Sequence, residues 1–325
     1  MSRTILAVDG GNSKTDLALL RDDGALLALV RGGLSSPHHI GLDGCVDLLR
    51  ALHDDAAARA GVDGEPADVG ALLLAGLDLP VEERRLHDAV SPLGWARRLT
   101  VGNDTFAVLR AGTERGWGVA VVCGAGINCV GVGPDGTHVR FPALGAISGD
   151  WGGGFDVGLA AVSAAARSED GRGPRTRLEQ AVPAHFGLAS PGELAAAIHL
   201  GSIALRRVVE LPPLVFSLAA EDAVAAVLVD RLAEEIVALV RVTVRRLGRD
   251  GDAVEVLLGG GLLQRADERL LEAIRAGLPG VALRAAASPP IVGAALLGLD
   301  ELGVGPDAYE RARRELGEAV ERIHG

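Results

Sequence analysis

Apolar residues fall into short continuous runs near the N-terminus and into stripes at helical spacing further on. Runs at residues 4–8 and 17–20, followed by an Asp-Gly turn at residues 23–24 and a third apolar run, predict a three-stranded meander. Residues 42–60 place apolar side chains on one helical face, and Gly61 is the expected C-cap. The strands and helices that follow predict an α/β fold.

The rest of the chain alternates between apolar runs of strand length and helical patterns. The expected strands are residues 69–75, 98–101, 254–258 and 281–284, and the expected helices are residues 81–93, 105–113, 157–167, 178–181, 191–200, 203–210, 221–247, 291–299 and 306–323. The Gly- and Pro-containing residues 32–41 predict a loop. Residues 168–215 are predicted to contain a helical insertion, to which the sequence assigns no chemistry.

The meander is predicted to occur twice. Residues 119–132 repeat the plan of the first copy, with a strand, a glycine bend at Gly124-Ala125-Gly126 and a second strand. An Asp-Gly turn at residues 135–136 again leads to a third apolar run. A repeat of this length indicates a duplicated domain and not a solenoid. Two such bends facing each other across a cleft would hold a polyphosphate from both sides.

The first bend carries candidate phosphate-binding residues. In chain order they are Asp9, Gly10, Gly11, Asn12, Ser13, Lys14 and Thr15. Glycine in a strand-turn-strand bend lets backbone N–H groups approach a phosphate closely. Asp9 ends the first strand, where its carboxylate would hold a hydrated Mg²⁺ against that phosphate. Lys14 is the only lysine of the chain and supplies a compact positive charge. The alternative is a β-hairpin with a glycine turn and no ligand.

Composition restricts the class of protein. A chain of 325 residues, 48% of them hydrophobic, is long enough for two domains with separate cores. The net charge of −11 disfavours nucleic acids and anionic membranes as partners, although a few local donors can still bind ATP. No apolar run approaches the roughly 18 residues of a membrane helix, and no signal peptide is expected. The three cysteines lack metal-binding spacing, which favours the reducing cytoplasm.

Three further stretches complete the pattern: Asn103-Asp104, Ser148-Gly149-Asp150 and Gly259-Gly260-Gly261. With the two glycine bends, they make the chain resemble the superfamily of sugar kinases, heat-shock chaperone ATPases and actin. Within it, the chain looks like the BadF/BadG/BcrA/BcrD-type ATPases and the N-acetylglucosamine kinases. The resemblance covers nearly the whole chain. It implies two duplicated ribonuclease H-like domains, as in the actin-like ATPase fold, with an ATP cleft between them.

The resemblance also implies domain boundaries. The first domain is expected to be residues 1–104, and the C-terminal helix of residues 306–325 is expected to return to it. The second domain is expected to be residues 105–305, with the helical insertion at about residues 168–215.

Asp104 is the candidate catalytic base. Ligands gather at the carboxyl ends of parallel strands, so Asp9, Asp104 and Gly124 are expected to converge. In related kinases the matching aspartate faces the acceptor hydroxyl, where phosphoryl transfer needs a carboxylate to orient the hydroxyl or accept its proton. The alternative is that Asp104 is a helix N-cap.

The resemblance assigns the remaining candidates. Gly259, Gly260 and Gly261 would support adenosine, with a tight strand-to-helix turn as the alternative. The candidate sugar contacts are Ser36, His38, Asn103, Asn128 and Asp150. The alternatives are a turn residue for Asn103 and a glycine-rich hinge in which Asp150 caps the next helix. Trp151 stands where relatives often have glutamate, and Pro37 stands near the place of an asparagine, so the identity of the sugar stays open.

The resemblance implies a sugar kinase that uses ATP and Mg²⁺ to phosphorylate an amino or N-acetylated hexose such as N-acetylglucosamine. A homodimer in the cytoplasm is expected, without nucleic-acid or membrane partners. One alternative is the activator ATPase of 2-hydroxyacyl-CoA dehydratases, which presents thiolates to an iron–sulfur cluster. Cys123 and Cys129 flank the second bend instead, which disfavours that alternative. The other alternative is a sensor that binds a sugar or nucleotide without catalysis.

Overall fold

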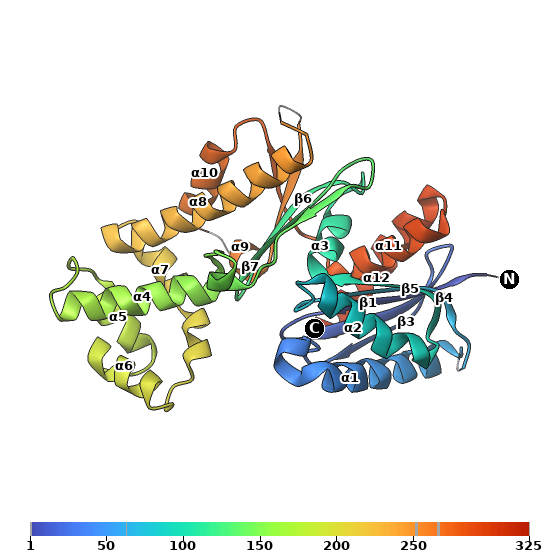
Figure 1. Cartoon of the computed structure of the whole chain (residues 1–325), viewed down its shortest axis with the longest axis horizontal. Coiled ribbons are helices and arrows are strands. Elements are labelled where there is room, and N and C mark those ends of the chain that lie inside the picture. The colour runs from blue at the N-terminus through green and yellow to red at the C-terminus, as the bar shows by residue number, and fades with distance from the viewer. Residues whose placement is uncertain (1, 63, 251–252, 265–266, 325) are drawn as a thin grey trace. The chain divides into compact units, whose positions relative to one another are not determined.

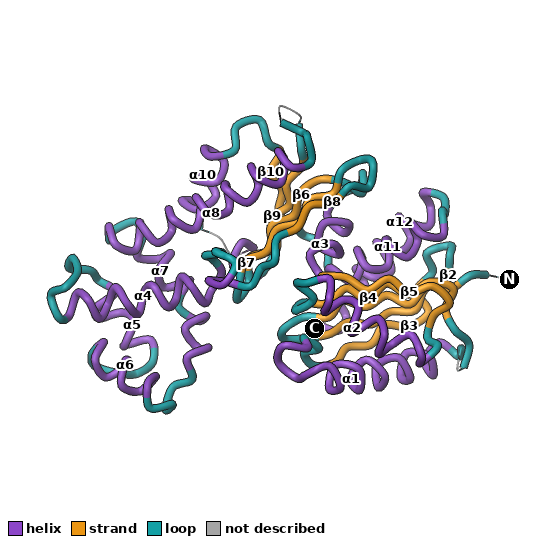
Figure 2. The backbone as a smooth tube through the Cα atoms, viewed as in Figure 1, coloured by secondary structure: helices purple, strands orange, loops and turns teal. Residues whose placement is uncertain are grey.

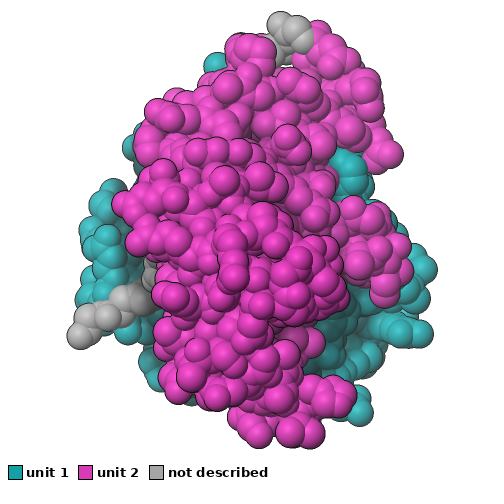
Figure 3. All heavy atoms as spheres, turned by 90° about the vertical axis from the view of Figure 1, so that its left-hand side faces the viewer, with its two compact units in different colours: residues 1–120, 132–142, 286–325 teal, residues 121–131, 143–285 magenta. Residues whose placement is uncertain are grey.

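The computed structural model describes residues 2–62, 64–250, 253–264 and 267–324. The chain forms two compact units, shown in different colours in Figure 3. Unit 1 comprises residues 1–120, 132–142 and 286–325, and unit 2 comprises residues 121–131 and 143–285. Each unit is described below by itself. Strands and helices alternate along most of the chain (Figure 2), as the hydrophobic pattern predicts.

The sheet of unit 1 has the strand order β3-β2-β1-β4-β5. Its strands are β1 (Thr4–Gly10), β2 (Thr15–Arg21), β3 (Leu26–Gly32), β4 (Ala67–Leu74) and β5 (Ala96–Asn103). The first three pair antiparallel and form the predicted meander, whereas β4 and β5 run parallel to β1. The sheet is therefore mixed, and β1, β4 and β5 end at one common edge.

Helices cover both faces of this sheet (Figure 1). On one face, Leu6 and Val8 of β1 pack with α1 (Pro37–Ala60) and α2 (Pro80–Val90). On the other face, Ile5 and Ala7 pack with α3 (Asp104–Gly112), α11 (Pro290–Leu302) and α12 (Pro306–His324). Fully burying a side chain such as Ile or Leu contributes about 1.5–3 kcal/mol. A register slip of one residue would exchange the two faces, so the register is strongly specified.

The C-terminal helices join this core by close backbone packing. A Cβ atom on Gly293 of α11 would lie 1.8 Å from the carbonyl oxygen of Ala107 in α3. Glycine is therefore required at the point where α11, predicted as a helix of residues 291–299, crosses α3.

The predicted loop at residues 32–41 is wrong from Pro37 onward. Helix α1 begins at Pro37, with Ser36 at the N-cap position, and Gly41 interrupts it with φ = +71°. Proline and glycine were taken as loop signals, but proline suits the first turn of a helix because its missing N–H has no intrahelical role there. The predicted C-cap is confirmed, since Gly61 is left-handed with φ = 67°.

The second sheet has the order β10-β9-β6-β7-β8. Its strands are β6 (Gly118–Cys123), β7 (Ile127–Val132), β8 (His138–Arg140), β9 (Glu255–Gly259) and β10 (Ala282–Ala285). Strands β6, β7 and β8 form the second predicted meander, and β9 pairs parallel with β10. Both predicted meanders are therefore present, each at the start of its own five-stranded sheet.

The helices of unit 2 include those of the predicted insertion and others on either side of it. They are α4 (Gly153–Glu169), α5 (Leu178–His185), α6 (Pro191–His199), α7 (Pro212–Leu218), α8 (Ala223–Arg246), α9 (Gly261–Gln264) and α10 (Glu268–Gly277). Helix α7 was not predicted, and α5 continues past Pro183, where the prediction had already ended the helix. Within the described residues, no helix combines the length and the apolar character needed to cross a membrane.

Candidate functional site

Carboxylates gather at the edge of unit 1 where its parallel strands end. Asp9 is the penultimate residue of β1 and pairs with Leu73 of β4, while Leu74 of β4 pairs with Asn103 at the end of β5. Asp104 follows directly as the first residue of α3, and Asp78 lies shortly after β4. The structure therefore brings Asp9 and Asp104 to one edge, together with Asp78, which sequence reasoning missed.

These carboxyl groups have raised pKa values. Burial, followed by the negative charges of Asp104 and Asp16, raises the pKa of Asp9 to about 8. Burial and the charge of Asp78 raise the pKa of Asp104 to about 7. Burial is also the main cause that raises the pKa of Asp78 to about 6. The pKa of each carboxyl group therefore lies near neutral pH, because burial and neighbouring negative charges disfavour the ionised form.

The first bend is built around Asp16, a fully buried carboxylate. Arg31 donates to it from Nε at 2.6 Å and from a terminal nitrogen at 3.0 Å, and Lys14 Nζ donates at 2.9 Å. Burial opposes ionisation of Asp16, but these bonds lower its pKa below the ordinary value. The two cations nearest the bend therefore pair with Asp16, and they lower the pKa of Asp9 by less than burial and the neighbouring carboxylates raise it.

The backbone of the bend is tightly constrained. Gly11 N donates to Lys14 O at 2.8 Å, and a Cβ on Gly10 would lie 2.4 Å from Ser35 Oγ. Thr15 is buried and its hydroxyl donates to Gly33 O at 2.8 Å. Asn12 and Ser13 are exposed at the tip of the bend. The predicted phosphate-binding residues thus divide into an exposed tip and a buried base.

Asn103 donates a hydrogen bond to Asp78 and directly precedes Asp104 in the chain. Its Oδ1 accepts from Thr105 N at 3.0 Å, which makes Asn103 the N-cap of α3. Its Nδ2 donates to Asp78 Oδ1 at 3.0 Å. The alternative that Asp104 is the N-cap is therefore wrong by one residue. Asp104 instead occupies the first helical turn, with its side chain not needed for capping.

His38 and Ser36 lie beside Asp78. His38 Nε2 is 2.8 Å from Glu82 Oε1, and the other oxygen of Glu82 accepts from the backbone N–H groups of Asp78 and Leu79. Ser36 is 1% exposed, and a Cβ on Gly76 would lie 2.6 Å from its hydroxyl oxygen. Gly76, with φ = +81°, therefore leaves room for Ser36 next to His38.

Arg140 of β8 completes this region. Its guanidinium donates to the carbonyl oxygen of Leu77 at 2.8 Å, to that of Asp78, and to the carboxylate of Glu83. Sequence reasoning missed this arginine, because only the fold brings residue 140 next to residues 77–83. Asp78 had a signal: it follows a predicted strand end, as Asp9 and Asp104 do.

The second bend borders a cavity of about 340 Å³ in unit 2. Its lining residues are Gly124, Ala125, Gly154, Val209, Pro212, Pro213, Phe216, Gly261 and Leu262. Two predicted motifs, the second phosphate motif and the adenosine motif, thus meet in one cavity. The apolar wall from residues 209–216 was missed, because α7 was not predicted, although the pair Pro212-Pro213 and Phe216 were visible in the sequence.

Glycines pack this cavity's floor closely. A Cβ on Gly260, which has φ = +88°, would lie 2.4 Å from Cys123 O. A Cβ on Gly153 would lie 2.5 Å from the backbone of Gly126. Gly154 N donates to Gly124 O at 2.7 Å. The tight-turn alternative therefore explains Gly260, whereas Gly261 lines the cavity itself.

The candidate sugar residues of unit 2 have local partners. Asp150 accepts from Ser148 Oγ, and Asn128 Oδ1 accepts from Cys129 N at 2.7 Å. The alternative that Asp150 caps the following helix is wrong, because α4 has Gly152 at its N-cap position. Trp151 carries the guanidinium of Arg231 over its ring at 3.9 Å from the centroid, a cation–π contact.

The three cysteines are free thiols in buried positions. Burial raises the pKa values of Cys45, Cys123 and Cys129 to about 12. A neutral thiol inside a core is not available as a thiolate ligand. This burial counts against the iron–sulfur activator alternative.

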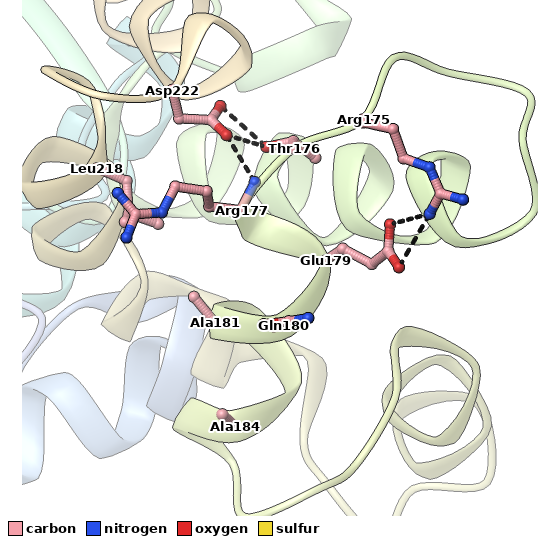
Figure 4. A pocket seen from close by; sticks show the side chains of 9 residues that line it. All are labelled: Arg175, Thr176, Arg177, Glu179, Gln180, Ala181, Ala184, Leu218 and Asp222. Atoms are coloured by element: carbon pink, nitrogen blue, oxygen red, sulfur yellow. Dashed lines mark hydrogen bonds and ion pairs between the residues drawn. The ribbon is translucent and has the colours of Figure 1, made fainter.

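A second cavity, of about 690 Å³, lies among the insertion helices of unit 2 (Figure 4). The Asp222 carboxylate accepts hydrogen bonds from Thr176 Oγ1 at 2.9 Å and from Arg177 N at 2.6 Å. Arg175 pairs with Glu179 at 3.1 Å. None of the predicted site residues lines this cavity, and each of its charged groups has a partner, Glu221 being that of Arg177.

Known proteins resemble this chain in sequence. The family model of the BadF/BadG/BcrA/BcrD ATPases matches residues 6–298. The chain is 27% identical over 260 residues to an N-acetylmuramic acid/N-acetylglucosamine kinase of Clostridium acetobutylicum, covering 80% of this chain and 85% of that protein. It is 24% identical over 319 residues to an N-acetyl-D-glucosamine kinase of Dictyostelium discoideum, covering 92% and 99%.

A solved structure shows the same fold. The structure of a candidate N-acetylglucosamine kinase from Chromobacterium violaceum superposes with a TM-score of 0.67 at 27% identity, covering 91% of this chain and 98% of that one. The predicted α/β fold of the actin-like ATPase type is thereby confirmed, with its two mixed five-stranded sheets. The chain belongs to the BadF/BadG/BcrA/BcrD ATPase family.

Proposed function

We propose that the protein is an ATP-dependent kinase that transfers the γ-phosphate to a hydroxyl of an amino or N-acetylated hexose, such as N-acetylglucosamine. The observation that carries the proposal is the half-buried Asp104 at the carboxyl edge of the unit 1 sheet, close enough to Asp9 for their charges to interact. The kinase names of both curated relatives and of the similar solved structure support the same activity.

Asp104 is the proposed base. The sugar hydroxyl oxygen attacks the γ-phosphorus, its proton passes to the Asp104 carboxylate, and ADP leaves. A base works best when its pKa lies near the working pH, and the pKa of Asp104 is raised to about 7. Phosphoryl transfer depends chiefly on positioning and charge neutralisation, so the protein needs one placed carboxylate for the proton and positive groups for the phosphate charge.

Asp9 is proposed to hold Mg²⁺, through water. Its surroundings fit a cation, because the charges of Asp104 and Asp16 act on the buried Asp9 carboxylate more strongly than those of Lys14 and Arg31, which pair with Asp16. Oxygen ligands and water are what Mg²⁺ prefers. When bound, the ion supplies positive charge to the phosphate oxygens. The bend residues 10–15 would contact phosphate, and an ammonium group has three donors, so Lys14 can bind phosphate as well as Asp16.

The cavity of unit 2 is proposed as the adenosine site. Gly259, Gly260 and Gly261 were expected to support adenosine, and Gly124 and Ala125 with Gly126 to bind phosphate. The aromatic ring of Phe216 and the flat prolines of α7 add an apolar wall of the kind that a base ring needs. The remaining candidates, Ser36, His38, Asn103, Asn128 and Asp150, stay proposed sugar contacts.

An ADP-release assay over a panel of hexoses, with ATP and Mg²⁺, tests the proposal. We expect turnover with at least one amino or N-acetylated hexose and none with buffer alone. ATP binding without turnover on any sugar would refute the kinase and favour the sensor alternative. A homodimer, a cytoplasmic location, and the lack of nucleic-acid and membrane partners are proposed too. Light scattering tests the dimer, and fractionation tests the location.

A further inference from the structure

Beside the proposed base lies a group of charged side chains, of which the proposed function uses only His38. We call His38, Asp78 and Glu82 the Asp78 cluster. One ligand-forming atom of each lies within 4.8 Å of the others. Asn103 Nδ2 holds Asp78 from one side at 3.0 Å, and Arg140 holds the backbone of residues 77–78. The cluster is therefore a fixed feature of the fold.

Helix capping explains only part of it. Glu82 accepts from the N–H groups of Asp78 and Leu79, which starts α2. This role accounts for Glu82 but not for a second carboxylate, Asp78, half-buried beside it. Carboxylates packed together and withdrawn from water are costly unless a positive charge joins them. The arrangement itself thus calls for a cation.

The local charge balance points the same way. The charged groups contributed by the elements around the cluster are Asp9 of β1, His38 of α1, Glu82 and Glu83 of α2, Asp104 of α3 and Arg140 of β8. Carboxylates outnumber cations in this set, and Arg140 pairs with Glu83. The Lys14 and Arg31 side chains, further along β2 and β3, pair with Asp16.

A buried hydroxyl next to the cluster also lacks a partner. Ser36 is 1% exposed, and its hydroxyl oxygen finds no hydrogen-bond partner among the residues that the structure describes. Ser36 Oγ and the ring of His38 both adjoin Gly76. Leaving a buried hydroxyl unpaired costs about 1–3 kcal/mol. A polar ligand at this place would supply hydrogen bonds as well as charge.

We propose that the Asp78 cluster binds the ammonium group of a free amino hexose, and that Asp78 makes such a sugar a better substrate than its N-acetylated or carboxylate-bearing counterparts. The inference rests on the proposed kinase function. An ammonium group donates three hydrogen bonds and carries the missing positive charge, whereas acetylation removes the charge. A sugar with a carboxylate, such as N-acetylmuramic acid, would place a like charge next to Asp78 and Glu82.

The test compares kcat/KM for glucosamine, N-acetylglucosamine and N-acetylmuramic acid. The protein is first dialysed against EDTA and then assayed with Mg²⁺ alone, so that no transition metal occupies the cluster. We expect glucosamine to be preferred over N-acetylglucosamine by about tenfold, the size of one favourable charge contact of ~1.4 kcal/mol, and N-acetylmuramic acid to be the poorest substrate. The preference should shrink at high pH, where the amine loses its charge.

Asp78→Asn keeps an oxygen for Asn103 and removes the charge. We expect it to lower the glucosamine to N-acetylglucosamine ratio about tenfold. Asp88→Asn is the matched control: it removes one negative charge from α2, the helix that begins two residues after Asp78, at a side chain that is 82% exposed, and should leave the ratio unchanged. If Asp78→Asn does not fold, the pH dependence of the ratio in the unaltered protein still decides.

The outcomes separate the two proposals. Turnover of N-acetylglucosamine at least as efficient as that of glucosamine overturns the ammonium site and leaves the kinase standing. A preference that appears only when a transition metal is added back also overturns it, in favour of a metal site. Calorimetric binding of glucosamine that depends on Asp78, without turnover of any sugar, supports the ammonium site and overturns the kinase.

Discussion

The two glycine bends share a backbone plan but differ in the side chains around them. Around the first bend, at residues 10–14, lie the buried carboxylates Asp9 and Asp16 and the cations Lys14 and Arg31. Around the second, at residues 124–126, lie an apolar cavity and the buried thiols of Cys123 and Cys129. Charged side chains therefore surround the first bend, whereas apolar groups surround the second.

The two copies of the meander therefore share a backbone plan but differ in the chemistry that they support. The meander fixes where a bend stands and how closely the backbone can approach a ligand. The chemistry comes from residues packed against the bend, which differ between the copies: strand-end carboxylates in unit 1, and glycines with α7 in unit 2. We therefore expect substitutions in unit 1 to affect the chemical step and proton balance, and substitutions in unit 2 to affect nucleotide affinity.

The largest expected effect is that of Asp104→Asn. Removing the proposed base should lower kcat by about 10²–10⁴-fold while ATP affinity changes little. In the unaltered protein, kcat/KM should fall as pH drops below about 7, because the Asp104 pKa is raised to about 7 and only the carboxylate accepts a proton. Steady-state kinetics and ATP titration calorimetry measure both quantities. A variant with normal kcat would break the assignment of chemistry to unit 1.

Gly260→Ala should be next in size. The new Cβ would lie 2.4 Å from Cys123 O at a backbone with φ = +88°, and we expect a loss of about 3 kcal/mol in stability. The control is Gly280→Ala, which has a similar φ of +83° but nothing within 4 Å of the new atom. Thermal denaturation measures the difference. Equal destabilisation of the two variants would mean that strain at positive φ, and not packing against the second bend, explains Gly260.

Phe216→Leu tests the apolar wall of the unit 2 cavity. Base–aromatic stacking is worth about 1–3 kcal/mol, so the KM for ATP should rise about tenfold with kcat little changed. Phe186→Leu, in the same helical insertion but outside that cavity, should leave the KM for ATP as it is. If both variants or neither changed nucleotide affinity, the cavity would not be the adenosine site.

The smallest expected effect is on stability, with Asp9→Asn. The folded-state pKa of Asp9, about 8, lies above its ordinary value of 3.8. The folded protein therefore holds this proton more tightly between about pH 4 and 8, and stability falls as pH rises through that window. Without Mg²⁺ at pH 8 the variant should be more stable than the unaltered protein, because asparagine has no charge that folding must bury.

Melting curves from pH 5 to pH 8.5 measure this difference. It should vanish toward pH 4 and shrink when Mg²⁺ is added, because the ion offsets the charge. A variant that is less stable than the unaltered protein at pH 8 would show that Asp9 contributes structural bonds that outweigh its buried charge.

Sequence reasoning found most of unit 1 because its signals are local. Asp9 and Asp104 each follow an apolar strand, and parallel strands bring such residues to one edge. The same logic applies to Asp78, which follows the predicted strand of residues 69–75. Pro37 was misjudged because a proline fits both a loop and the first turn of a helix.

Contacts between residues that lie far apart in the sequence were not predicted. Arg140 meets Leu77, Asp78 and Glu83, and Phe216 lines the same cavity as Gly124. Nothing in the neighbourhood of either residue in the sequence indicates its partner, since each contact depends on how helices and strands pack.

Most strands and helices, the two meanders, and the glycine bends with their strand-end carboxylates could be read from local patterns, because periodicity and turn chemistry act over a few residues. The cations that pair with Asp16, the carboxylates that lie near Asp104 and the apolar wall beside the second bend follow from packing alone. Charge balance and burial are sums over neighbours in space, and those neighbours come from parts of the chain that only packing brings together.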